Sequence, residues 1–139
     1  MNHHPHPPLR YFLLMFMAAT SLANGLLMVV FTEQWYLCIA NPARAALYSA
    51  HFVTDVGTAY LTIGTALLWA TLSPARGLPL VMMALLFSAL HAVHHVWEYG
   101  SFGVPTRSVL IELFGIWGPV AILGWLGLDL RRAEQEQTA

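Results

Sequence analysis

Four apolar runs, each about as long as a bilayer is thick, dominate this sequence and restrict the folds open to it. About 20 predominantly apolar residues in a helix cross the hydrocarbon core. Charged residues make up only 9% of the chain, whereas about a quarter of a typical soluble domain is charged. The sequence therefore predicts an all-α integral membrane four-helix bundle, antiparallel and up-and-down, with both termini on the same side. The predicted spans are residues 11–31, 51–72, 78–98 and 108–130.

Polar segments flank this single bundle domain, residues 11–130. Residues 1–10 are rich in histidine and proline and predict a disordered tail, and residues 131–139 predict a solvated C-terminal tail. The first span is longer than the core of a signal peptide, about 7–15 residues, so we expect it to remain as a membrane helix. Asn41 and Pro42 are a favourable helix start, from which the second helix could begin before it enters the hydrocarbon.

Arginine placement predicts the orientation of the bundle. Cytoplasmic loops of membrane proteins carry an excess of Lys and Arg. With four spans, one side of the membrane would hold four arginines and the other side only Arg44 and Arg107. We therefore expect a multi-pass protein of a bacterial inner membrane with both termini in the cytoplasm. The four arginines on the expected cytoplasmic side are Arg10, Arg76, Arg131 and Arg132.

A stripe of ionisable residues ends the third span. His91, His94, His95 and Glu98 are spaced i, i+3, i+4 and i+7, so they share one face of a helix. Ionisable side chains inside a membrane are expensive, usually face a bundle interior, and mark functional sites. The sequence therefore predicts a site on this stripe.

The second span carries a further polar stripe, which we expect to face the bundle interior as well. Gly57 and Gly64 on this span are expected to allow close helix packing. In the up-and-down topology, the stripes of spans two and three, Glu112 of span four and Asn24 of span one all fall in the outer half of the bundle. The stripe on the second span consists of His51, Thr54, Asp55, Thr58, Thr62 and Thr65.

Pooling these residues predicts a mononuclear or dinuclear metal site of mixed nitrogen and oxygen donors, which suit Fe, Mn, Zn or Cu(II). We expect Fe, Cu or Zn, and a function linked to redox or oxygen chemistry. In an alternative arrangement, the carboxylates orient the ligating imidazoles instead of binding the metal. Asn24 is a further candidate. The predicted metal ligands are His51, Asp55, His91, His94, His95, Glu98 and Glu112.

The spacing His91-x-x-His94-His95 resembles one histidine box of the membrane desaturases and hydroxylases, which are di-iron enzymes that use oxygen. Those enzymes carry three such boxes, whereas this chain has one. The resemblance covers five residues. It implies that such a spacing can hold iron in a membrane bundle, and it does not assign the chain to that family.

Three other functions compete with a metalloprotein. Two histidines facing each other across the bundle, such as His51 with His91 or His95, could ligate haem b. His–carboxylate pairs could carry protons in acid–base chemistry on a lipid or in transport. The chain could also be a non-redox accessory subunit whose histidines only hold the bundle together.

The expected partners are the lipid bilayer, a lipophilic substrate or membrane partner protein, and a further copy of the chain. The net charge of −1 and the lack of a basic patch argue against nucleic acid. The single cysteine, Cys38, excludes an internal disulfide. The sequence contains no serine nucleophile elbow, phosphate-binding loop or HExxH zinc motif.

Overall fold

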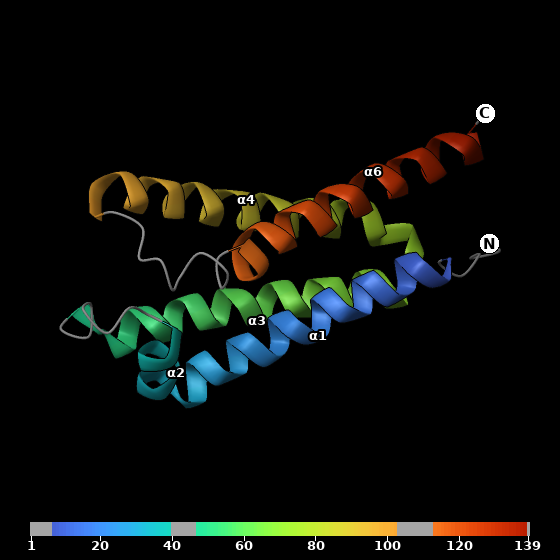
Figure 1. Ribbon diagram of the computed structural model, residues 1–139. Helices are drawn as coiled ribbons and strands as arrows, with labels where there is room; N and C mark the ends of the chain where they lie inside the picture. The colour runs from blue at the N-terminus through green and yellow to red at the C-terminus, as the bar shows by residue number, and fades with distance from the viewer. Residues whose placement is uncertain (1–6, 40–46, 103–112, 139) are drawn as a thin grey trace.

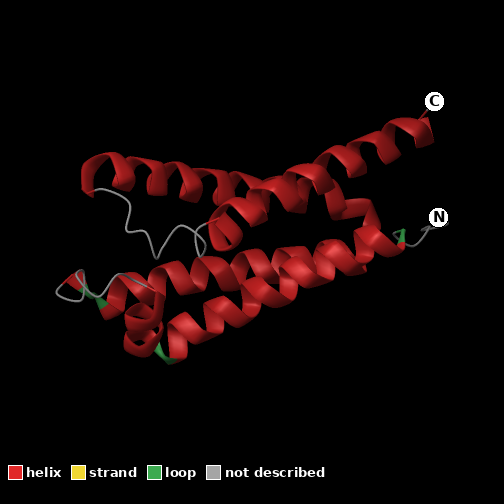
Figure 2. Ribbon diagram, viewed as in Figure 1, coloured by secondary structure: helices red, strands yellow, loops and turns green. Residues whose placement is uncertain are grey.

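The computed structural model describes residues 7–39, 47–102 and 113–138, and almost all of these residues are helical, with only short loops between the helices (Figure 2). This confirms the all-α class. Two short helical turns, the 3₁₀ turn η2 (Pro74–Arg76) and the π-helical turn η3 (Leu113–Trp117), accompany the five α-helices of this part of the chain. The α-helices are α1 (Pro8–Val30), α2 (Thr32–Ile39), α3 (Ala50–Leu72), α4 (Gly77–Phe102) and α6 (Gly118–Thr138).

The long helices form two antiparallel pairs (Figure 1). Helix α1 packs chiefly against α3, and α4 packs against both α6 and α3. The 3₁₀ turn η2 joins α3 to α4 at the end of the molecule where both termini lie. The main hydrophobic core occupies this same half of the bundle, because it is built from the early residues of α1 and α4, the late residues of α3 and the middle of α6. The core residues are Leu14, Met17, Ala18, Leu67, Ala70, Val81, Ala84, Leu123, Leu126 and Leu130.

Three glycines bring the backbones of α1 and α3 together. A Cβ atom on Gly57 would lie 2.8 Å from Met28 Cβ, and one on Gly64 would lie 2.8 Å from the backbone nitrogen of Leu22. A Cβ atom on Gly25 would lie 2.7 Å from the carbonyl oxygen of Gly57. Any larger residue would therefore force the two helices apart. The predicted role of Gly57 and Gly64 in close packing is confirmed, and Gly25 is a third member that the sequence analysis did not single out.

Three helical segments are long and apolar enough to cross a membrane: Pro8–Val30, Pro74–Trp97 and Leu113–Thr138, with mean hydropathies of 2.0, 1.7 and 1.6. This supports a membrane protein. Helix α3, the second predicted span, is equally long but is not among the three. Five threonines together with His51 and Asp55 dilute its apolar residues.

Several element boundaries differ from those expected. Residues 32–39, between the first two predicted spans, form the short helix α2. Helix α3 begins at Ala50, one residue before the predicted span, and the alternative start at Asn41 lies outside the described residues. The start of α3 is set by Ser49, whose hydroxyl oxygen accepts a hydrogen bond from the backbone nitrogen of Phe52 at 3.3 Å. Helix α6 continues to Thr138, through most of the segment expected to be a tail, and its last residues are largely exposed.

Candidate functional site

The histidines of α4 divide between two faces of the helix. His91 and His95 are half-buried, and their ring centroids lie 4.8 Å apart with the planes at 72°. His94 is exposed, and its ring centroid lies 6.2 Å from that of His95. Four residues make slightly more than one helical turn, so His91 and His95 occupy one face. The structure therefore brings together two of the three predicted imidazoles on the inner side of α4.

Two aromatic side chains enclose His91. Phe87, one turn earlier on α4, stacks against the imidazole with a centroid distance of 5.8 Å and an angle of 7°. Tyr60 of α3 meets His91 edge-on at 6.0 Å and Phe87 at 5.5 Å. We call Tyr60, Phe87, His91 and His95 the histidine–aromatic cluster. It joins α3 to α4 in the half of the bundle away from the termini, and the Nδ1 atom of His95 is buried within the protein.

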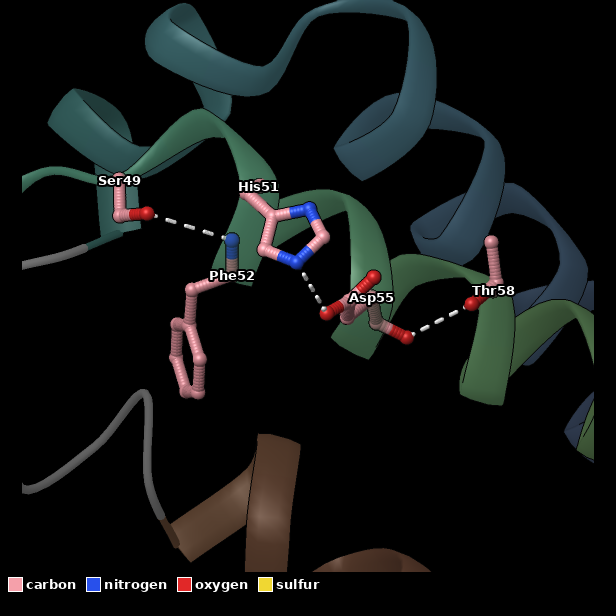
Figure 3. Close-up of polar contacts among 5 residues, drawn as sticks. All are labelled: Ser49, His51, Phe52, Asp55 and Thr58. Atoms are coloured by element: carbon pink, nitrogen blue, oxygen red, sulfur yellow. Dashed lines mark hydrogen bonds and ion pairs between the residues drawn. The ribbon is translucent and has the colours of Figure 1, made fainter.

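His51 and Asp55 form a separate pair on α3 (Figure 3). The Nε2 atom of His51 lies 3.3 Å from Oδ2 of Asp55, and the two side chains are 89% and 63% exposed. His51 and Tyr60 are nine residues apart, which on an α-helix corresponds to roughly opposite faces and about 13 Å along the axis. Because Tyr60 contacts His91, the His51–Asp55 pair points away from the inner histidines of α4.

The polar stripe of α3 does not face inward as expected. Thr58, Thr62 and Thr65 are exposed together with His51 and Asp55, and only Thr54 of the predicted stripe is half-buried. The three exposed threonine hydroxyls donate to carbonyl oxygens of their own helix at 2.8–2.9 Å. A different face of α3, which carries Gly57 and Gly64, packs against α1 because close backbone contact is possible there.

Asn24, the further candidate ligand, bonds to Trp35 and Met28 and to none of the other predicted ligands that the structure describes. Its Oδ1 accepts a hydrogen bond from Nε1 of Trp35 at 3.0 Å, and its Nδ2 lies 3.5 Å from the sulfur of Met28. Asn24 therefore attaches α2 to α1. A second contact holds the following segment, since the hydroxyls of Thr32 and Tyr48 lie 2.7 Å apart.

The remaining predicted ligands are the carboxylates Glu98 and Glu112. The Glu98 side chain and all of Glu112 lie outside what the structure describes. Among the described residues, no group of three or more His, Cys, Asp or Glu side chains is placed to hold a metal ion. Five of the seven predicted ligands are therefore described: an inward pair, His91 with His95, an outward pair, His51 with Asp55, and the exposed His94.

Sequence reasoning missed Tyr60, Phe87 and Trp35. Phe87 could have been found from the sequence, because it precedes His91 by four residues and shares its helix face. Tyr60 was revealed only by its tertiary contacts with Phe87 and His91. No protein family, curated protein or solved structure matches the chain. Among the described side chains, the inward imidazole pair of His91 and His95 is the strongest chemical feature.

Proposed function

We propose that this protein is an integral membrane four-helix bundle that binds one transition-metal ion through His91 and His95. The observation that supports it is the pair of adjacent imidazoles, 4.8 Å between centroids, on the inner face of an apolar helix. Two histidines at i and i+4 on one helix face are the arrangement by which zinc-protease helices bind their metal. Here the intervening residues are Ala92, Val93 and His94, so the general base of those proteases is absent.

Helix α3 is the fourth span in this proposal. Three crossings would leave the ends of the chain on opposite sides of the membrane. The ion pair between Arg10, near the start of α1, and Asp129, in the second half of α6, instead holds both ends together at 2.6 Å. An even number of membrane crossings is consistent with this contact, because it returns both ends of the chain to the same side. Helix α3 is the only further candidate of sufficient length among the described elements, and it lies alongside α1 with backbone contact at Gly57.

Both termini face the cytoplasm in this proposal. The end of the bundle that contains the Arg10–Asp129 pair also carries Arg76, Arg131 and Arg132. Arginine concentrates on the cytoplasmic side of membrane proteins. The histidine–aromatic cluster then lies in the outer half of the membrane.

The donor set fits a metal that accepts two imidazoles and leaves other positions open. Zn, Cu(II) and Fe all bind imidazole. Glu98 follows His95 by three residues and is the proposed third ligand by that spacing. A bound zinc ion would act as a Lewis acid, whereas iron or copper would supply electron transfer. The chain's own contribution is to hold the two rings: Phe87 stacks on His91, and Tyr60 limits its rotation from α3. His51 and Asp55 are not in this ligand set, because they point outward.

The test is the metal content of the protein purified in detergent from metal-replete cells, with His94→Gln as the matched control. His91→Gln and His95→Gln each remove an inner imidazole and should lower bound metal to background. His94→Gln removes a neighbouring imidazole that is exposed, and its metal content should equal that of the wild type. A metal-free wild type, or equal loss in all three variants, contradicts the proposal. A Soret absorption band would replace it with haem ligation.

A further inference from the structure

One exposed face of α3 repeats with the spacing of a helix–helix contact. Its residues alternate by four and three positions over the whole length of the helix, which is the heptad pattern of two packed helices. All of them are exposed, and the face lies about 120° around the helix from Gly57 and Gly64, which contact α1. We call this face the α3 seam. It consists of His51, Asp55, Thr58, Thr62, Thr65, Trp69 and Leu72.

Asp55 lies at a depth where its neighbours are apolar. Gly57 contacts Met28 and Val29 of the antiparallel α1, so Asp55, which lies about 3 Å nearer the start of α3, is level with Val30. Tyr60 contacts His91, and the same count along α4 places Asp55 level with Val96. Val30 and Val96 are both exposed. Val30 ends the apolar segment Pro8–Val30, and Val96 is the penultimate residue of Pro74–Trp97. Asp55 therefore lies at the outer edge of the expected hydrocarbon layer, where a carboxylate gains from a polar partner on another helix.

The threonines of the seam need no polar partner on another helix. Their hydroxyls already donate to carbonyl oxygens of α3, so they present a small and nearly apolar surface that allows a second helix to come close. The polar groups that favour a partner helix are His51 and Asp55, at one end of this surface. The seam therefore combines a smooth stretch suited to helix contact with a polar His–Asp pair at the edge of the expected hydrocarbon layer.

We propose that the α3 seam packs against the same seam of a second copy of this chain. All copies share one orientation in the membrane, so a two-fold axis along the membrane normal sets two α3 helices parallel, with identical residues facing each other. Each copy then brings an imidazole donor and a carboxylate acceptor one turn apart to the interface. The His51 of one copy can donate to the Asp55 of the other, which makes the seam complementary to itself. This inference rests on α3 crossing the membrane, as proposed above.

The test is disulfide cross-linking in native membranes from cells that express two differently tagged copies. Cys38→Ala removes the native cysteine, and Thr62→Cys then places the only thiol in the middle of the seam. The matched control is Ala23→Cys, which is exposed at a similar depth on α1. Mild oxidation should give several-fold more cross-linked dimer carrying both tags from Thr62→Cys than from Ala23→Cys. Adding Thr65→Trp, a bulky change on the exposed seam, should abolish the difference.

Two outcomes overturn the proposal. One is a yield from Thr62→Cys no higher than that from Ala23→Cys. The other is a product that carries one tag and the mass of a different protein, which would assign the seam to another partner. Failure of the underlying topology is distinguishable, because a Thr62→Cys thiol outside the membrane would react with a membrane-impermeant maleimide. A thiol within the hydrocarbon would not react.

Discussion

Arg10 and Asp129 are ion-paired across almost the whole length of the chain, with Nε of Arg10 2.6 Å from Oδ2 of Asp129 and 119 positions between the residues. Arg10 is 11% exposed and Asp129 34% exposed. The contact joins the first turn of α1 to the second half of α6. It is the specific interaction that places both ends of the bundle together, and the proposed even number of membrane crossings depends on it.

Breaking this pair should lower stability. Arg10→Gln leaves the Asp129 carboxylate without its charged donor, and we expect a loss of about 1–2 kcal/mol in the free energy of unfolding, because the pair is only partly shielded from solvent. Thermal unfolding of the detergent-purified protein measures it. Arg131→Gln, at an exposed arginine on the same end of the bundle, is the control and should be neutral. The double exchange Arg10→Asp with Asp129→Arg should recover part of the loss. Equal melting temperatures for the wild type and Arg10→Gln would show that the contact contributes nothing.

The glycines between α1 and α3 should tolerate no side chain. Gly64→Ala puts a methyl group 2.7 Å from Cγ and 2.8 Å from the backbone nitrogen of Leu22, and the backbone can move only if the helices separate. We expect a cost of about 1–3 kcal/mol from this overpacking. Gly124→Ala is the matched control, because nothing lies within 4 Å of its added Cβ. There alanine should stabilise α6 by up to about 1 kcal/mol through its higher helix propensity. The same melting experiment compares them, and similar effects of the two substitutions would contradict the close contact.

The native cysteine reports the orientation of the bundle. Cys38 is exposed on α2, which follows α1 at the end away from the termini. If the termini are cytoplasmic, a membrane-impermeant maleimide added to intact cells should label Cys38 in the wild type. In a Cys38→Ala background, Thr138→Cys should be labelled only after the cells are opened. The reverse pattern would invert the proposed orientation, and labelling of both sites in intact cells would argue against the even number of crossings.

Local sequence patterns predicted most of the secondary structure. Long apolar runs identified α1, α3 and α4 to within a few residues, since the length of an apolar run and the helical period are properties of a continuous segment. The run for α6 was identified, but this helix begins and ends well after the predicted bounds. The i, i+4 spacing likewise placed His91 and His95 on one face before any tertiary contact was known. The start of α3 was less predictable, because Asn41 and Ser49 are both good helix caps, and the structure uses Ser49.

Periodicity tells which residues share a face, and only packing decides which face turns inward. Helix α3 has threonines with His51 and Asp55 on one side and Gly57 with Gly64 on the other, and each pattern is typical of an inward face. The glycine side packs against α1 because only there can the two backbones touch, and this leaves the polar stripe outside. The pairing of Asn24 with Trp35, of His91 with Tyr60 and of Arg10 with Asp129 was also decided by the tertiary structure. Each of these contacts joins residues on different helices, whose relative rotation no single segment of sequence determines.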